Sequence, residues 1–322
     1  MTQHANRNEK PRRPALLCSL LIGLGGALGT LGLPGSALPN TRAEAAKDIH
    51  NLRTRAATIA HLASPSPRIT IPVGWFLMGS PRKDHAPFAI EVPFDNSETP
   101  QRRIWLDAYA IDRDEVSLGN YLAGVLRKPR ALPPDLAQLE ELKELAEFAR
   151  PLTGSGMPPD RILATWPAFN VSWAEADTYC RSIGKRLPTE AEWEKAARGT
   201  KGRLFPWGNA APDARRAVFG QDTRDALPRV APVAGVKGGR SPYGLYHMAG
   251  NVAEWVQDWS GIDYYVSMPD RNPPGPANGR YKVVRGGSWR SNPAMLRAAT
   301  RGGAPPEQRA PTIGFRCAKS GV

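Results

Sequence analysis

Alternating apolar and polar positions predict several short strands in the first third of the chain. Residues 69–71 and 75–80 are apolar-rich runs separated by a Pro–Gly turn, and residues 103–111 alternate as a half-buried strand does. A helix is expected over 118–126, with Ser117 as its N-cap. The pattern therefore predicts short strands mixed with helices.

Two capping boxes mark helix starts in the middle of the chain. Ser172 is followed three residues later by Glu175, and Thr189 is followed by Glu192 at the same spacing. The second box opens a helix over 190–198 that is rich in glutamate. These carboxylates could suggest acid–base chemistry, but we expect most of them to face water or to cap backbone groups.

Residues 127–165 are interpreted as a helical insertion. An apolar stripe in it is formed by Leu136, Leu139, Leu142, Leu145 and Phe148. Such a stripe is typical of a packing surface, and the alternative is a partner site. Residues 47–68 are expected to form a short helix and a linker.

A glycine-rich turn follows the last well-marked strand, at residues 283–292. Neither Gly286 nor Gly287 carries a Cβ, so the backbone can bend sharply and another chain or a ligand can approach closely. Ser288 would then present a hydroxyl group. The alternative interpretation is a strand end with a glycine bulge.

The N-terminal residues 1–46 have the organisation of an export signal. Basic residues precede an apolar run from Ala15 to Leu33, and small residues follow it. The same run is long enough for an uncleaved membrane anchor. We therefore expect a periplasmic or otherwise exported protein, or one anchored to the inner membrane by this segment.

The remaining cysteines and the charge narrow the class of protein. Once residues 1–46 are removed, Cys180 and Cys317 remain, which in an exported protein suggests one disulfide; the alternative is two buried thiols. The formal net charge of +13 is spread along the chain, which suits an anionic partner. No nucleic-acid-binding motif is present, and contact with a membrane is expected only through an uncleaved N-terminal segment.

Five sequence blocks in the same order resemble the formylglycine-generating enzyme (sulfatase-modifying factor) family. They lie at residues 171–194, 205–208, 243–255, 285–289 and 314–317. The resemblance implies an α+β, variant C-type-lectin-like fold over residues 69–320, rich in loops and low in regular secondary structure. It also implies that Cys180 pairs with Cys317.

The resemblance implies two calcium sites, each with one ligand changed. The first comprises the carbonyls of Gly250 and Val252, the Glu254 carboxylate, and His247 where the family has an oxygen ligand. The second comprises Val218, Phe219, Asp225 and Leu227, with Val218 where the family has an Asn side chain. Calcium prefers oxygen ligands, so calcium remains a possible cofactor at weakened sites.

The catalytic cysteines of the family are missing from this chain. The enzymes oxidise a substrate cysteine with O₂ and use two cysteines after the Gly-Gly-Ser turn to bind copper(I). Ser291 occupies the first position, and the second falls within residues 293–296, where there is no cysteine. Copper is therefore not expected. The candidate pocket residues are Ser288, Ser291, Arg297 and Arg301.

These features lead to three functional hypotheses. The first is an exported maturation or oxidation factor acting on a peptide or protein, in a branch that lacks the catalytic cysteines and resembles pyoverdine-maturation-type relatives. The second is a non-catalytic binding or scaffold module. The third is a cysteine-oxidising enzyme with a rebuilt site.

Overall fold

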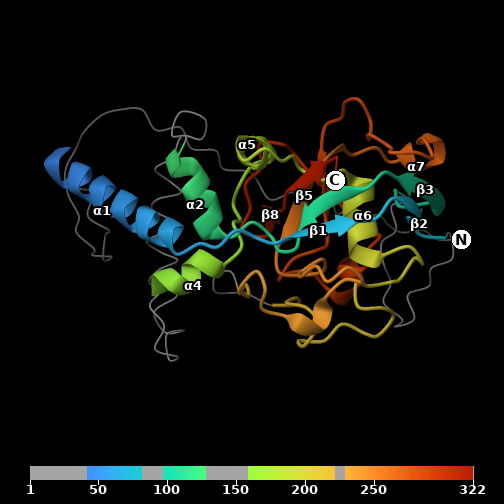
Figure 1. Cartoon of the computed structure of the whole chain (residues 1–322), viewed down its shortest axis with the longest axis horizontal. Helices are drawn as coiled ribbons and strands as arrows, with labels where there is room; N and C mark the ends of the chain where they lie inside the picture. The colour runs from blue at the N-terminus through green and yellow to red at the C-terminus, as the bar shows by residue number, and fades with distance from the viewer. Residues whose placement is uncertain (1–41, 82–96, 128–158, 222–228, 322) are drawn as a thin grey trace, which may run out of the picture.

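The computed structural model describes residues 42–81, 97–127, 159–221 and 229–321 (Figure 1). Its strands are β1 (Arg68–Ile71), β2 (Gly74–Met78), β3 (Arg102–Leu106), β4 (Tyr109–Asp112), β5 (Ala253–Trp259), β6 (Lys282–Arg285), β7 (Arg301–Ala304), β8 (Ile313–Phe315) and β9 (Ala318–Ser320). Its helices are α1 (Arg42–His61), α2 (Leu118–Arg127), α4 (Pro159–Thr165), α5 (Trp173–Ser182), α6 (Glu190–Arg198) and α7 (Tyr264–Ser267), with 3₁₀ turns η2 (Lys237–Gly239) and η3 (Pro293–Leu296).

The strands of the described residues form three small sheets. One sheet has the order β1-β4-β9, a second is the pair β2-β3, and a third has the order β7-β6-β5-β8. The third sheet is mixed, because β5 runs antiparallel to β6 and parallel to β8. This mixture of short strands, helices and loops confirms the predicted α+β class.

The strand predicted over residues 103–111 is wrong, because the chain changes sheets in its middle. β3 ends at Leu106 and pairs with β2, whereas β4 begins at Tyr109 and pairs with β1 and β9. Between them, the Asp107 N–H donates to the Asn272 side chain instead of to a neighbouring strand. β3 alternates between buried and more exposed residues, whereas all four residues of β4 are buried. Reading the two strands as one alternating run therefore misses the change of sheet.

Three helices form a layer on one side of the sheets, at the left of Figure 1. Ala56 and Ile59 of α1 are buried against Leu122 of α2 and Leu163 of α4. Gly119 permits the close approach, because a Cβ there would lie 2.8 Å from the Ala63 Cβ. The segment expected as a short helix and linker therefore contributes side chains to the core.

Two expected segments fall mainly outside the described residues. Residues 1–41 hold the apolar run of the expected signal or anchor, and residues 128–158 hold the apolar stripe of the expected insertion. α4 lies at the end of that insertion. Within the described part of the chain, no helix is long and apolar enough to span a membrane.

The helix α6 lies at the centre of the molecule, and all nine of its residues are buried. The prediction that most of its glutamates face water or cap the backbone is wrong. Glu190 and Glu194 are 1% and 0% exposed, and both pair with arginines from the C-terminal third of the chain. The capping box of Thr189 and Glu192 is confirmed, as is that of Ser172 and Glu175.

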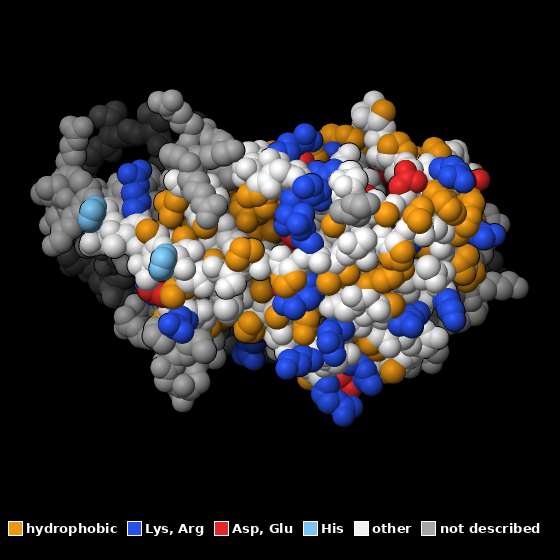
Figure 2. Space-filling view, viewed as in Figure 1, with side chains coloured by type: hydrophobic (Ala, Val, Ile, Leu, Met, Phe, Trp, Pro, Cys, Tyr) orange, Lys and Arg blue, Asp and Glu red, His pale blue; other side chains and the backbone are white. Residues whose placement is uncertain are grey.

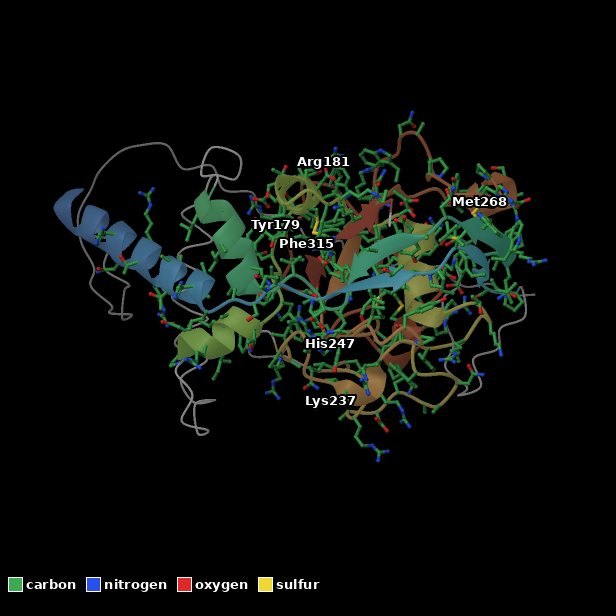
Figure 3. The ribbon with its side chains drawn as sticks, viewed as in Figure 1. Tyr179, Arg181, Lys237, His247, Met268 and Phe315 are labelled. Carbon is green, nitrogen blue, oxygen red and sulfur yellow. A yellow bond between two sulfur atoms is a disulfide. The ribbon has the colours of Figure 1, made fainter. Side chains whose placement is uncertain are left out.

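The predicted disulfide is present and joins α5 to the C-terminal strands. Cys180 and Cys317 are both fully buried in a cluster that includes Tyr179, Tyr121 and Phe315. Figure 3 shows the bond near Tyr179 and Phe315. The Phe315 ring packs edge-on against both tyrosines, with centroid distances of 5.5 and 6.1 Å. The bond therefore lies in an aromatic part of the core.

Reduction of Cys180–Cys317 is expected to lower the free energy of unfolding by about 4–5 kcal/mol, because the bond closes a loop of 137 residues that restricts the unfolded chain. Urea unfolding with and without a phosphine reductant measures the change. The control is the double variant Cys180→Ala/Cys317→Ala, which should not respond to reductant. An unchanged midpoint in wild type, with Cys180 and Cys317 both shown to be reduced, would contradict the expectation.

Candidate functional site

The turn after β6 has a backbone conformation that requires its two glycines. Gly286 and Gly287 have φ values of 90° and 68°, in the region that side chains disfavour. A Cβ on Gly286 would lie 3.1 Å from the Trp193 ring, and one on Gly287 would lie 2.9 Å from the Met295 carbonyl oxygen. The turn is therefore packed tightly on both sides.

Ser288 and Ser291 lie together in this turn and complete each other's hydrogen bonds. The Ser291 Oγ accepts from the Ser288 N–H at 2.9 Å, and the two hydroxyl oxygens are 3.5 Å apart. The Ser291 N–H donates to the Ser288 carbonyl at 2.9 Å. Asn292 then caps η3, since its Oδ1 accepts from the Met295 N–H at 3.2 Å. The serine hydroxyls thus close a local turn.

Trp289 fixes the turn to the neighbouring loops. Its side chain is 1% exposed, and its Nε1–H donates to the Pro311 carbonyl at 3.0 Å. Its backbone N–H donates to Asn251, and its carbonyl accepts from Gln221. The Trp289 indole is therefore part of the core.

The two candidate pocket arginines are buried in ion pairs. Arg297 donates to the Glu98 carboxylate at 2.7 and 3.3 Å, and its side chain is 3% exposed. Arg301 donates to both Glu190 oxygens at 2.7 and 2.9 Å and to the Ser97 carbonyl. The structure brings these arginines near the turn, but it does not offer their guanidinium groups to a ligand.

The Glu254 carboxylate, expected as a calcium ligand, is fully engaged by protein donors. Arg316 donates to both of its oxygens at 2.6 and 2.7 Å, and the Trp193 Nε1–H donates at 2.8 Å. A calcium ion bound to the same oxygens would lie against the Arg316 guanidinium, which also carries positive charge. The first expected calcium set therefore does not fit that ion in this structure.

Glu115 extends this charged cluster. Its carboxylate accepts from the Asn251 amide at 2.7 Å and from the Val252 N–H at 3.3 Å. Burial, followed by repulsion from Glu254, raises its pKa well above the ordinary value. In the neighbouring loop, the Gly250 backbone packs closely against the Val218 backbone. A Cβ on Gly250 would lie 2.4 Å from the Val218 carbonyl oxygen.

His247 is a buried neutral side chain in the same loop. It is 4% exposed, its Nε2 lies 3.0 Å from the Pro232 carbonyl, and it faces the charged groups of Asp114 and Arg316. Burial is the main cause that lowers its pKa to about 4, so at neutral pH the imidazole is uncharged and donates from Nε2. Figure 3 places it in the loops below the sheets.

The second expected calcium set lies partly outside the described residues, because Asp225 and Leu227 fall in 222–228. The Val218 carbonyl accepts from the Asn251 N–H, and the Phe219 carbonyl accepts from the Gln221 amide. Calcium at this set stays a prediction. Among the residues that the structure describes, no group of three or more His, Cys, Asp or Glu is arranged to hold a metal ion.

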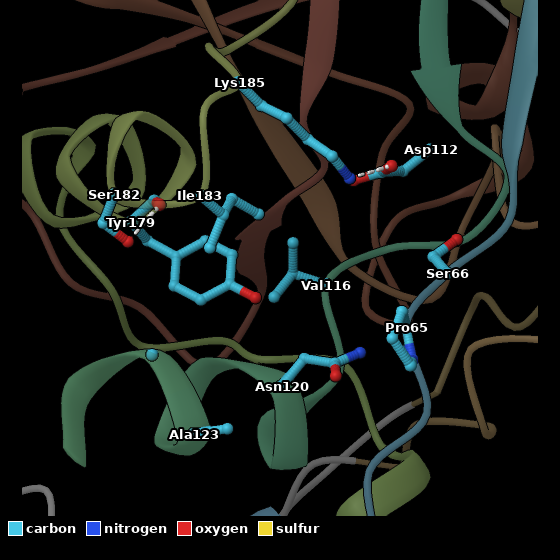
Figure 4. Close-up of a pocket in the computed structure, with 11 residues that line it drawn as sticks. Pro65, Ser66, Asp112, Val116, Asn120, Ala123, Tyr179, Ser182, Ile183 and Lys185 are labelled. Carbon is cyan, nitrogen blue, oxygen red and sulfur yellow. Dashed lines mark hydrogen bonds and ion pairs between the residues drawn. The ribbon is translucent and has the colours of Figure 1, made fainter. Parts of the chain in front are cut away.

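An open pocket of about 310 Å³ lies between α2, α5 and the start of β1 (Figure 4). Its walls are mostly apolar, and the Lys185–Asp112 ion pair lies at one end, with Nζ and Oδ1 2.5 Å apart. Burial raises the Asp112 pKa even though Lys185 is adjacent. Lys185 is 17% exposed, so its ammonium group can also donate to an entering carbonyl or carboxylate.

Sequence reasoning did not identify this pocket. Its residues come from segments far apart in the chain, including Ser66, Asn120, Tyr179 and Lys185. One local signal exists: Gly124 lies on the helical face that meets Tyr179, and a Cβ there would lie 2.6 Å from that ring. A glycine in the middle of a helix is an indication of close packing.

A family model described as "Sulfatase-modifying factor enzyme 1-like domain" matches residues 56–321. The chain belongs to the sulfatase-modifying factor family. This family member is 31% identical to the mouse protein named Formylglycine-generating enzyme, over 78% of this chain and 74% of the mouse protein. It is 29% identical to the mouse Inactive C-alpha-formylglycine-generating enzyme 2, over 81% of this chain and 88% of that protein.

Other similarities cover part of a longer protein or concern the fold alone. The Chlamydia pneumoniae Serine/threonine-protein kinase pkn1 is 44% identical over 49% of this chain, which spans only 24% of that kinase. Among solved structures, Treponema denticola variable protein 1 has a TM-score of 0.56 at 22% identity, covering 79% of this chain and 95% of that one. PvdO from Pseudomonas aeruginosa has a TM-score of 0.55 at 23% identity, covering 80% and 98%. Both confirm the expected lectin-like fold.

The donor set after the Gly-Gly-Ser turn does not fit the copper(I) that the family resemblance implies. Copper(I) prefers thiolates, and this turn supplies the hydroxyl group of Ser291. Cys180 and Cys317 are disulfide-bonded, and the third cysteine of the sequence, Cys18, lies outside the described residues. We therefore derive no reaction step through copper for this family member.

The free energy of unfolding of the variant His247→Asn is expected to depend less on pH than that of wild type, because the variant lacks the histidine. The histidine pKa is about 4 in the folded state and about 6.5 when unfolded, so the unfolded chain binds more protons between these values. The His247 contribution is full above pH 6.5 and decreases by about 2–3 kcal/mol as the pH falls towards 4. Asparagine tolerates the positive φ of 52° at this position.

Urea unfolding of wild type and His247→Asn between pH 7 and 4.5 tests this expectation. Buried acids such as Glu115 make the stability of both proteins depend on pH. The informative quantity is therefore the difference in free energy of unfolding between wild type and variant at each pH. Wild type should lose more stability than the variant on acidification. Parallel pH profiles would show that His247 is not held neutral.

Proposed function

We propose that this chain is an exported binding member of the sulfatase-modifying factor family, which engages a peptide or protein partner without copper–thiolate oxidation. One observation carries the proposal. At the position where the family resemblance calls for a copper-binding cysteine, the Ser291 hydroxyl accepts a hydrogen bond from the Ser288 N–H and so completes the turn. The Ser291 hydroxyl group therefore already has a hydrogen-bond partner within its own turn.

The surroundings of Ser291 support this assignment. The next residues form η3, capped by Asn292, in the segment where the second cysteine would be expected. Ala294 and Leu296 of η3 are buried. The nearby guanidinium groups of Arg297 and Arg301 already neutralise Glu98 and Glu190. Buried paired charges of this kind are held in place by their partners and contribute to structure.

Export is supported by the disulfide together with the N-terminal sequence. Disulfides persist in oxidising compartments, and Cys180–Cys317 forms in the core of the fold. The basic residues and the apolar run from Ala15 to Leu33 have the order of an export signal. An inner-membrane anchor formed by the same run is the alternative location.

A peptide or protein partner is supported by the pocket of Figure 4 and by the charge. The pocket combines apolar walls with the polar Lys185–Asp112 pair, as sites for peptide side chains do. The net charge of +13 favours association with an acidic partner. The sequence holds no nucleic-acid-binding motif, so the proposal does not include nucleic acid.

A second candidate function is a maturation or oxidation factor that acts on a peptide or protein substrate. The observation that favours it is the 31% identity with the mouse Formylglycine-generating enzyme. It differs from the binding proposal in one measurable respect, because it requires the chain to change its partner covalently.

Incubating the purified exported domain with copper(I), O₂ and a cysteine-containing peptide tests the binding proposal. We expect no aldehyde above the protein-free rate, and no copper(I) retained against a chelator, because Ser291 offers a hydroxyl where a thiolate is needed. Mass spectrometry of the peptide and metal analysis of the protein provide the two readouts.

The control is a formylglycine-generating enzyme that contains both cysteines, treated identically. Oxidation of the peptide by this chain with many turnovers would overturn the binding proposal. In that case Ser291→Ala distinguishes the remaining hypotheses, since a loss of rate at unchanged stability would indicate a rebuilt site that uses the hydroxyl group.

A further inference from the structure

The outward face of the β2–β3 ribbon carries two tryptophans and one arginine, and Arg271, from the segment after α7, lies over it. Side chains alternate along both strands, and the inward positions include Phe76 and Ile104, which are 1% and 0% exposed. We define the Arg–Trp face by the outward ribbon residues Trp75, Arg103 and Trp105 together with Arg271, which covers Trp105. The face lies at the end of the molecule opposite α1 (Figure 1).

The two indoles on this face contact each other across the ribbon. Trp75 and Trp105 are directly opposite in the β2–β3 register. Their ring centroids are 5.4 Å apart, and their planes meet at 74°, which is an edge-to-face arrangement. This contact fixes both rings at the surface.

Each indole is covered by a guanidinium group. The Arg103 Cζ lies 4.9 Å from the Trp75 ring centroid, and the Arg271 Cζ lies 4.7 Å from that of Trp105. Arg271 is held there by backbone bonds on either side of it. The Trp105 N–H donates to the Asp270 carbonyl, and the Asn272 N–H donates to the Trp105 carbonyl. Stacking of this kind leaves the guanidinium N–H edges open to a second partner.

Neither arginine of the face has a carboxylate partner among the described residues, and both are exposed. Arg102, next in sequence to Arg103, is paired with Asp270. Asp107 is close to the face, but its carboxylate accepts from the Trp105 Nε1–H and the Asn272 amide. The face therefore presents two guanidinium groups that form no ion pair in the described part of the fold, with the single negative charge of Asp107 nearby.

The chemistry of the face selects among classes of ligand. A sugar ring would need an open indole face, and both indoles are already covered by guanidinium groups. A carboxylate would need a guanidinium edge, and two are available. Val73, which is 53% exposed next to β2, adds an apolar neighbour for the rest of a peptide. Figure 2 shows basic and hydrophobic side chains together at this end of the molecule.

We propose that the Arg–Trp face is a docking surface for an acidic peptide segment of a partner protein. Carboxylates of the partner pair with Arg103 and Arg271, and its apolar side chains pack on the indole edges and Val73. Tryptophan and arginine are the residue types that most often dominate the binding energy of protein interfaces. The proposal concerns a different surface from the Ser288–Ser291 turn and stands whether or not that turn has a catalytic role.

Binding of poly-L-glutamate to the full exported domain at about 0.15 M ionic strength tests the proposal. The test variant is Arg103→Glu/Arg271→Glu. The matched control is Arg240→Glu/Arg280→Glu, which changes the net charge equally and also replaces exposed arginines that stack on aromatic rings, those of Tyr246 and Tyr281. Calorimetry or fluorescence anisotropy gives the dissociation constants, and circular dichroism confirms the fold of each variant.

We expect the test variant to bind poly-L-glutamate about tenfold more weakly than wild type, and the control to change by less than about twofold. Equal weakening in both variants would overturn the proposal, because it would show a response to net charge alone. Wild-type binding to phosphatidylglycerol vesicles but not to poly-L-glutamate, lost in the test variant, would also overturn it and assign the face to a membrane surface.

Discussion

The buried carboxylate of Glu194 is the interaction on which the rest of the structure depends. It accepts from the Gly79 N–H at 2.7 Å, from Arg198 at 3.0 Å and from Arg285 at 2.5 Å. These donors come from the end of β2, from α6 itself and from the end of β6. A single fully buried side chain thus joins the first ribbon, the central helix and the strand that leads into the Gly-Gly-Ser turn. Removing one member of such a group leaves an uncompensated charge in the core, which is far more costly than losing an exposed ion pair.

The same network determines what the candidate site can do. Arg285 also donates to the carbonyls of Ala298, Ala299 and Thr300, so it fixes the chain that returns from η3 to β7. Gly286 packs on Trp193 of α6, and Trp193 donates to Glu254. The turn is consequently held in one conformation by buried charged groups that are already paired with other groups of the protein. This supports a structural role for Ser288 and Ser291 and directs attention to surfaces away from the turn.

How much the sequence could predict depended on how local each interaction was. The capping boxes at Ser172 and Thr189 involve residues three apart, and both were predictable from spacing. The pairing of Cys180 with Cys317 followed from the family resemblance. The burial of Glu194 was not predictable, because its partner Arg285 is 91 residues away and only the folded chain brings them together. The Arg–Trp face was missed for a similar reason, since Arg271 reaches Trp105 only after the strand ribbon has formed.

The most direct test of this account is the coupling energy between Glu194 and Arg285, measured by urea unfolding of Glu194→Gln, Arg285→Met and the double variant. The account predicts that each single substitution lowers the free energy of unfolding by about 3–5 kcal/mol, and that the double variant loses clearly less than the sum. Single substitutions that cost no more than about 0.5 kcal/mol, as expected for the exposed pair Asp177–Arg181, would contradict it.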